Sequence, residues 1–485
     1  MAPISRISST DELKRSNAAR STICEDQKCG HTISISSIRF WLALATLPYF
    51  EIRWINSRTS FLKNKRILFN KTKMVTHFDI SRLTACHACD LLIEKPYVLP
   101  GNKALCPRCS TPIYEPRVNT LNRTLALVIV GLILLWPAIF FPILNMTILG
   151  NTSFNTLIGG VVGMYQDGFY WVAFVVLFAS ILAPVAKLII LLIVLLQVKL
   201  NIYTKWLPSL FRFYGYLGPW GMLEVYMIGV LISVTKLVDL ADLHMGIGLF
   251  CFVGLLLTDT LATLTLDKEQ VWKHIEKISG RKAQLTSKSA GLISCHDCHK
   301  LLRYPEIKEH QKLICPRCGA NVHKRRPGSL TKTWALVITA LICLIPANMY
   351  PIMTLVYRGQ GEPSTIIAGV LLLVKEHMIP IALVVFIASI AVPFLKIAGL
   401  IWLLLSVQFK WNLRRRQRTI MYRAIEAIGR WSMLDIFVIS ILVTLVNLGS
   451  LAEITGGLAG TFFCAAVVMT MLAAVCFDPR LIWDE

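Results

Sequence analysis

Cys86-His-Ala-Cys89 and, sixteen residues later, Cys106-Pro-Arg-Cys109 recur 209 positions along the chain as Cys295-His-Asp-Cys298 and Cys315-Pro-Arg-Cys318. Two C-x2-C pairs at this separation are typical of a zinc ribbon, in which four thiolates hold one Zn²⁺ tetrahedrally. A ribbon is too small to bury an adequate core, so bound metal supplies much of its folding free energy. The sequence therefore predicts two structural zinc sites with no open position for catalysis.

Two other uses of these cysteines compete with structural zinc. A C-x-x-C redox centre normally accompanies a βαβ unit, which the surrounding sequence does not predict. A rubredoxin-like iron site would use the same four thiolates. The nearby histidines are expected to be solvated or to lie beside the ligands rather than to bind metal; these are His87, His296, His299 and His310.

The repeat continues beyond the cysteines, which indicates duplication of a whole module. At the same offset of 209 the matched pairs are Pro137 with Pro346, Pro142 with Pro351, Ser180 with Ser389, Pro184 with Pro393, and Lys187 with Lys396. At an offset of 211 the matches are Trp220-Gly-Met-Leu-Glu224 with Trp431-Ser-Met-Leu-Asp435, Asp267 with Asp478, and Trp272 with Trp483. The chain is therefore predicted to contain two copies of one unit.

Composition indicates that both modules lie in a membrane. Of the 485 residues 55% are hydrophobic, and the mean hydropathy is +0.59, above what a soluble protein of this length shows. The apolar residues gather in runs that approach the ~20 residues needed to cross a bilayer. The predicted spans are 121–143, 169–198, 219–238 and 246–266 in the first module, and 331–350, 378–407, 431–449 and 458–477 in the second. The predicted fold class is an α-helical polytopic membrane protein of two repeated modules, each a cytoplasmic zinc ribbon plus four transmembrane helices.

The position of the basic residues predicts the orientation. A formal net charge of +22 could suggest nucleic acid, but the Lys and Arg side chains lie mostly between hydrophobic runs, as in cytoplasmic loops. Segment 144–168 has no Lys or Arg, whereas segment 410–430 has seven. The ribbons and both termini are therefore expected in the cytoplasm, and nucleic acid is not an expected partner.

The domain boundaries follow from the same features. Four segments are predicted, namely ribbon 1 (81–118), transmembrane module 1 (119–270), the linker with ribbon 2 (271–328), and transmembrane module 2 (329–485). Residues 1–80 have no counterpart in the second half. They are expected to be a disordered leader or to include a mis-assigned start, and a natural start at Met74 is the preferred interpretation.

Charged and polar residues inside the apolar runs mark a candidate cluster in each half, because intramembrane charge is costly and usually faces protein or a watery cavity. The candidates are Ser389, Lys396, Ser432, Asp435 and Thr470 in the second half, and Lys187, Glu224 and Asp259 in the first. From helix lengths we expect Lys187 to meet Glu224, and Lys396 to face Asp435 or a hydrated cavity. A structural ion pair, or a lysine extended to the headgroups, is the competing interpretation.

Known catalytic motifs are absent from the sequence. It contains no Walker sequence, no G-x-S-x-G elbow and no H-E-x-x-H helix. We therefore do not expect an enzyme.

Taken together, these motifs resemble the paraquat-inducible protein A family of PqiA/LetA-like intermembrane transport proteins. The resemblance runs from about residue 80 to the end, and the leader before Met74 departs from it. Beside the ribbons it rests on Phe386-Ile-Ala-Ser-Ile-Ala-Val-Pro-Phe-Leu-Lys396, Gly429-Arg-Trp-Ser-Met-Leu-Asp435 and Arg480-Leu-Ile-Trp-Asp484.

The resemblance implies an inner-membrane component of a lipid transport system in the Gram-negative envelope. Its implied partners are membrane phospholipids and a periplasmic MCE-domain tunnel protein, to or from which it passes lipid. It also implies a transport role, with proton movement as one route, for the polar cluster of the second half. Glu224 and Asp259 depart from the family's residue types, so an equal role is not expected in the first half.

Two further functions stay open from the residues alone. One is a proton-coupled exporter of small amphiphiles that needs no periplasmic tunnel. The other is a membrane scaffold whose ribbons dock a partner protein.

Overall fold

The structure, a computed structural model, is mostly helical. It describes residues 83–95, 98–148, 151–237, 242–280, 291–304, 313–357, 360–375, 377, 379–411, 413–446 and 452–484. The predicted leader and His310 lie outside these residues.

The first module starts with two small hairpins and continues as helices. The hairpins pair β1 (Leu83–Ala85) with β2 (Leu92–Glu94) and β3 (Ala104–Leu105) with β4 (Pro112–Tyr114). The next elements are α3 (Thr120–Phe140), β5 (Leu144–Ile148), β6 (Asn151–Asn155), α4 (Leu157–Gln166), α5 (Tyr170–Leu177) and the π-helix η2 (Phe178–Leu182). The last are α6 (Ala183–Leu200), α7 (Leu207–Leu217), α8 (Leu223–Leu237), β7 (Asp242–Met245), α9 (Ile247–Thr265) and α10 (Lys268–Ser279).

The second module repeats this order. Its hairpins pair β8 (Gly291–Ser294) with β9 (Leu301–Tyr304) and β10 (Leu313–Ile314) with β11 (Asn321–Val322). Then come α11 (Ser329–Met349), β12 (Met353–Tyr357), β13 (Gln360–Ser364), α12 (Ile366–Lys375), α13 (Ile379–Phe386), the π-helix η3 (Ile387–Ala391) and α14 (Val392–Gln408). The chain continues through α15 (Arg415–Ile428), the 3-10 helix η4 (Gly429–Met433), α16 (Leu434–Val446), β14 (Ala452–Gly456), α17 (Leu458–Cys476) and the 3-10 helix η5 (Pro479–Trp483).

Six helical segments of the described chain are long and apolar enough to cross a membrane. They are Thr120–Phe140, Tyr170–Leu200, Ile247–Thr265, Ser329–Met349, Ser389–Gln408 and Leu458–Cys476. The other two predicted spans correspond to α8 and α16, which have 15 and 13 residues. The prediction began both too early, because Trp220 lies in a turn and Trp431 lies in η4. The chain is a multi-pass membrane protein, and the described part of the third helix in each module is shorter than the six spans.

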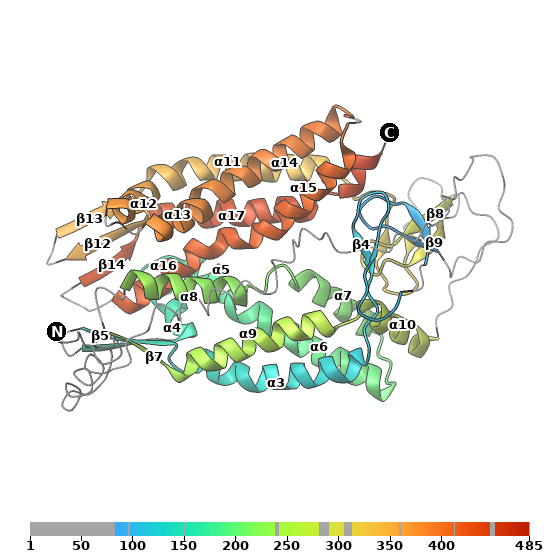
Figure 1. The fold of residues 1–485 in the computed structure, drawn as a ribbon, viewed down its shortest axis with the longest axis horizontal. Helices are drawn as coiled ribbons and strands as arrows, with labels where there is room; N and C mark the ends of the chain where they lie inside the picture. The colour runs from blue at the N-terminus through green and yellow to red at the C-terminus, as the bar shows by residue number, and fades with distance from the viewer. Residues whose placement is uncertain are drawn as a thin grey trace, which may run out of the picture. The chain divides into compact units, whose positions relative to one another are not determined.

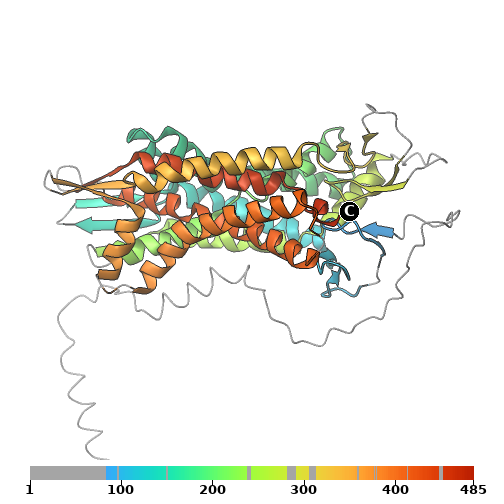
Figure 2. The ribbon, with the colours of Figure 1, turned by 90° about the horizontal axis from the view of Figure 1, so that it is seen from above.

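A three-stranded antiparallel sheet lies at one end of each module, and the ribbons lie at the other end (Figures 1 and 2). The strand orders are β6-β5-β7 and β13-β12-β14. We call these two ends the strand end and the ribbon end. The sequence analysis expected 144–168 to be a loop, but it contains the β5–β6 hairpin and the short apolar helix α4.

Matched residues lock the first and last helices of each module together at the ribbon end. The Thr120 hydroxyl donates to the Thr265 carbonyl and accepts from the Asp267 N–H at 2.9 Å. Ser329 makes the same two contacts in the second module, at 2.8 Å to the Cys476 carbonyl and 3.0 Å from the Asp478 N–H. The equivalence explains why α3 packs along α9 as α11 packs along α17 (Figure 1).

The two modules meet mainly through their short third helices, α8 and α16. Tyr226 and Phe437, which are equivalent in the repeat, lie with ring centroids 5.5 Å apart in an edge-to-face contact. The helices approach closely at Gly229, where an added Cβ would lie 3.2 Å from Cβ of Phe437. α16 also packs against α4 and α5, whereas α8 makes no comparable contact with α12 or α13 among the described residues.

Candidate metal centres and intramembrane polar cluster

Each ribbon gathers four buried cysteines whose sulfur atoms lie within 4.8 Å of one another. In ribbon 1, Sγ of Cys86 lies 3.5 Å from Sγ of Cys109, and Cys89 lies 3.6 Å from Cys106. In ribbon 2 the equivalent distances are 3.5 Å for Cys295–Cys318 and 3.6 Å for Cys298–Cys315. Four sulfurs in this arrangement fit one tetrahedral metal ion per ribbon.

A tight backbone turn in each C-x2-C pair brings its two cysteine side chains together. The residue after the second cysteine of every C-x2-C pair adopts a left-handed conformation; these are Asp90, Ser110, His299 and Gly319. Its N–H turns back to the carbonyl of the first cysteine, as from Asp90 to Cys86 at 2.9 Å. The two cysteines of a pair are thereby held on one side of a tight turn.

The thiols of one ribbon strongly perturb one another. Hydrogen bonds between the sulfurs, with Cys86 first, lower the pKa of Cys106 to about 2, and the reciprocal bond raises the pKa of Cys86 to about 12. One thiolate in the group thus suppresses ionisation of its neighbour. A divalent cation would allow all four to be thiolates, which is the form that binds metal.

The histidines lie beside the sulfur groups. The rings of His87 and His299 meet between the two ribbons with centroids 5.4 Å apart. Burial lowers the pKa of His299 to about 3, so this ring is neutral at physiological pH. Each sulfur group consists of cysteines alone.

In the first module the intramembrane lysine forms an ion pair with one of the two carboxylates of its predicted cluster. Nζ of Lys187 lies 2.8 Å from Oδ2 of Asp259, which is on α9. Asp259 belongs to the same predicted cluster as Lys187 and Glu224, and it is α9 rather than α8 that supplies the directly bonded carboxylate. Lys187 is buried, with 8% of its surface exposed.

In the second module the equivalent lysine has lost this partner. Thr470 stands where the first module has Asp259, and its hydroxyl donates to the Val467 carbonyl of its own helix at 2.8 Å. Lys396 is 3% exposed, and its Nζ has no hydrogen-bond partner in the described part of the chain. No hydrogen bond therefore joins Lys396 to Asp435, and the expectation that Lys396 faces Asp435 or a hydrated cavity stays a prediction.

Lys396 lies against η4. A Cβ added at Gly429 would lie 3.0 Å from Nζ of Lys396, so the glycine leaves the space that the ammonium occupies. Three residues along the same helix, the buried hydroxyl of Ser432 is also without a partner among the described residues. The role of Gly429, the first residue of the Gly429–Asp435 motif, appears only in the structure.

A π-helix precedes each lysine in the same helical run, and sequence analysis missed it. In η2 the N–H of Ala183 reaches back five residues to Phe178, and in η3 the N–H of Val392 reaches back to Ile387. The cause is the following proline, whose ring cannot fit an α-helical turn without clashing with the carbonyl four residues earlier. That residue is Ser180 or Ser389, whose hydroxyl bonds the carbonyl of Val176 or Val385 at 2.7 Å.

The wider π turn leaves a backbone carbonyl available to a neighbouring segment. In the first module the Ala179 carbonyl accepts from the N–H of Met222, 3.3 Å away, just before α8. In the first module the π-helix therefore joins the lysine-bearing helix to the segment that carries Glu224.

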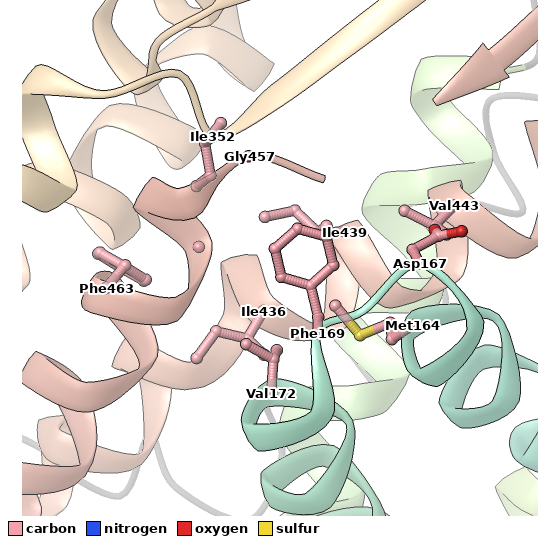
Figure 3. Close-up of a pocket in the computed structure, with 11 residues that line it drawn as sticks. Met164, Asp167, Phe169, Val172, Ile352, Ile436, Ile439, Val443, Gly457 and Phe463 are labelled. Atoms are coloured by element: carbon pink, nitrogen blue, oxygen red, sulfur yellow. The ribbon is translucent and has the colours of Figure 1, made fainter. Parts of the chain in front are cut away.

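A narrow apolar crevice lies between the modules near the strand end (Figure 3). Met164, Phe169 and Val172 line one wall, and Ile436 and Ile439 of α16 line the other. Asp167 is the only charged side chain of its lining. The helix that lines this crevice, α16, also carries Asp435 in its first turn.

A family comparison then identifies the architecture. The model of the family described as "Paraquat-inducible protein A" matches residues 121–276 and residues 330–485, one match in each module. The chain belongs to this family. The paraquat-inducible protein A region thus occurs twice and coincides with the two transmembrane modules.

Curated relatives are similar along most of their length. The chain is 34% identical over 423 residues to "Intermembrane transport protein PqiA" of Escherichia coli (strain K12), covering 85% of this chain and 98% of that protein. It is 34% identical over 399 residues to "Lipophilic envelope-spanning tunnel protein A" of the same strain, covering 82% and 90%. It is 31% identical over 418 residues to "Probable intermembrane transport protein" of Haemophilus influenzae, covering 85% and 98%. No solved structure matches the chain significantly.

Proposed function

We propose that this chain is the inner-membrane component of a lipid transport system and passes phospholipid-like lipids to or from a periplasmic MCE-domain tunnel protein. Its relatives are named as intermembrane transport and envelope-spanning tunnel proteins, which supports a role in envelope transport. The proposal adds the cargo, the partner and the orientation, with ribbons and both termini in the cytoplasm, and it assigns no enzymatic activity.

The observation that carries the lipid proposal is the unpartnered amine of Lys396. A buried ammonium without a partner is costly, and so is a buried hydroxyl such as that of Ser432. The phosphate of a lipid headgroup offers oxygen acceptors and negative charge to both groups. We infer that the transport cluster is Ser389, Lys396, Ser432, Asp435 and Thr470, with headgroup phosphate as the ligand of Lys396.

The first module has a different part in this proposal. Lys187 is already neutralised by Asp259, so it offers no free positive charge to a headgroup. We infer that this module supports the fold and that the second module handles the lipid. We infer that the acyl chains run along α16, whose Ile436 and Ile439 line the apolar crevice.

We also propose zinc as the metal of both ribbons. Four buried thiolates per site suit zinc, and the closed set of ligands gives a structural rather than a catalytic role. The ribbons occupy 81–118 and the end of 271–328, each ahead of its own transmembrane module.

Photocrosslinking tests the proposal. Cells producing the tagged chain together with a candidate MCE-domain partner are fed a phospholipid with a photoreactive acyl chain. Ultraviolet crosslinking, purification and mass spectrometry then identify captured lipid and protein. We expect both phospholipid and the MCE-domain protein with the native chain, and clearly less lipid with Lys396→Met at equal abundance.

The outcomes separate this function from its alternatives. Lipid transport that persists when the MCE-domain partner is deleted would favour an exporter. Unchanged lipid capture by Lys396→Met, together with loss of function when ribbon surfaces are altered, would favour a scaffold. Either result contradicts the proposal.

A further inference from the structure

Ribbon 1 contacts both modules. Lys95 forms an ion pair with Glu269 of α10 at 3.4 Å, and a second set of contacts reaches the end of the second module. The guanidinium of Arg108, inside its second knuckle, lies over the ring of Trp483 with 4.2 Å to the centroid. Trp483 also packs against the cysteine cluster of this ribbon. The buried Arg480 donates to the His87 carbonyl at 3.2 Å and forms an ion pair with Asp90 at 3.2 Å. Ribbon 1 thus packs against η5, the segment that follows the last transmembrane helix.

Ribbon 2 docks on the first module through equivalent residues. Arg317, at the knuckle position that matches Arg108, lies over Trp272 with 5.9 Å to the centroid. Trp272 is the counterpart of Trp483 and belongs to α10. Tyr216 on α7 adds a hydrogen bond to Asp297 of this ribbon at 2.9 Å. The two stacking contacts are therefore crosswise: the knuckle arginine of each ribbon meets a tryptophan that follows the last membrane helix of the other half's module.

From ribbon 1 a short series of contacts leads to the polar cluster of the second module. The indole N–H of Trp483 donates to the Thr419 hydroxyl on α15 at 3.0 Å. Arg416 on the same helix donates to the hydroxyl of Ser110 in the ribbon at 2.6 Å. α15 continues directly into η4, whose first residue is Gly429. Gly429 is the residue against which the Lys396 ammonium lies.

The equivalent path of contacts in the first module leads to Lys187, which already forms an ion pair with Asp259. Ribbon 2 contacts α7, and the chain then passes to Glu224 at the start of α8. Lys187 is fixed by its ion pair with Asp259 on another helix. A change at ribbon 2 therefore leaves the main contact of Lys187 in place, whereas Lys396 depends on the position of η4.

We propose that Arg108 and Trp483 are positioning residues for the lipid-binding cluster. Their stacking holds ribbon 1 on α15, and α15 in turn holds Gly429 and Ser432 against Lys396. Ribbon 1 thus sets the geometry of the cluster in the module of the other half. This inference rests on the proposed function for its transport consequence but not for its structural one.

Hydrogen exchange gives the structural readout in purified, full-length protein. We expect Arg108→Ala and Trp483→Ala to speed amide exchange in peptides covering 415–433 by up to about tenfold, since stacking of a cation on an indole contributes modestly. The matched controls are Arg317→Ala and Trp272→Ala, which should leave that region unchanged. Trp483→Phe keeps an aromatic face and should restore slow exchange.

Lipid capture gives the functional readout in the same variants. We expect photoreactive phospholipid capture to fall in Arg108→Ala and Trp483→Ala, with the double variant no worse than either single one, because both act through one contact. Equal effects of the ribbon 2 controls, additive losses, or unchanged exchange at 415–433 would overturn the inference. If native protein captures no phospholipid while the exchange pattern holds, the proposed function fails and the positioning contact stands. If abundance or zinc content falls in the alanine variants and Trp483→Phe fails to restore exchange, the residues only stabilise the ribbon and the inference is overturned.

Discussion

Lys187 and Asp259 form an ion pair inside the first module, with 2.8 Å between Nζ and Oδ2. The second module keeps the lysine, as Lys396, but has Thr470 in place of the aspartate. One substitution between two copies of the same unit thus converts a neutralised lysine into a buried amine without a hydrogen-bond partner among the described residues. In this way one module can support the fold while the other binds the lipid.

Restoring a carboxylate at position 470 should reduce lipid binding by the second module. In Thr470→Asp we expect Lys396 to gain an ion pair like that of Lys187, because the two positions are equivalent. The protein should melt at a higher temperature and capture less photoreactive phospholipid. Thr470→Asn is the neutral control and should change both properties less. Normal lipid capture by Thr470→Asp, at normal abundance, would be inconsistent with a headgroup role for the free amine.

The reciprocal change should destabilise the first module. Asp259→Thr leaves Lys187 buried without its carboxylate, and removal of one partner of a buried pair costs ~3 kcal/mol or more. We expect lower abundance and a lower melting temperature by thermal-shift measurement. The neutral pair Lys187→Met with Asp259→Leu should recover much of this loss and keep transport. Transport lost in that double variant at full abundance would assign the first module a direct role.

Metal analysis of purified protein should find about two zinc ions per chain, one for each group of four thiolates. Cys295→Ser and Cys315→Ser should lower protein abundance, because a ribbon without metal loses much of its folding free energy. Ser110→Ala, next to the knuckle but outside the sulfur group, is a control that should keep full zinc content. Iron instead of zinc, or a stable protein free of metal, would refute the structural-zinc proposal.

Reporter fusions test the orientation. A reporter after Glu485 and one inserted near Arg415 should both report the cytoplasm, because the basic residues gather at the ribbon end. An insertion near Asn151, between the strands of the β5–β6 hairpin, should report the periplasm. Exchange of any of these results would overturn the proposed topology.

The sequence could predict features that depend on regular spacing. The C-x2-C pairs determine the sulfur groups, and the offset of 209 reveals two modules, because both are patterns along the chain. The sequence places Lys187 in one cluster with Glu224 and Asp259, but which carboxylate pairs with the lysine could not be predicted, since it depends on which face of α9 turns toward α6. The π-helices had a sequence signal, a proline four residues after a serine in an apolar run. This signal could not be interpreted without the backbone structure. The packing of ribbon 1 against Trp483, far away in the chain, has no signal in the local sequence.

The central claim is that the amine of Lys396 binds a lipid headgroup. The most direct measurement is phospholipid transfer in reconstituted membranes by the double variant Lys396→Met with Asp435→Leu, together with the MCE-domain partner. This variant replaces both charged side chains of the cluster with apolar ones, so it leaves no buried charge at these two positions and its abundance should stay near normal. We predict that transfer falls about tenfold or more, because a charge-assisted contact contributes ~1.5–3 kcal/mol. Full transfer by this neutral variant, at normal abundance and with normal partner binding, would contradict the account.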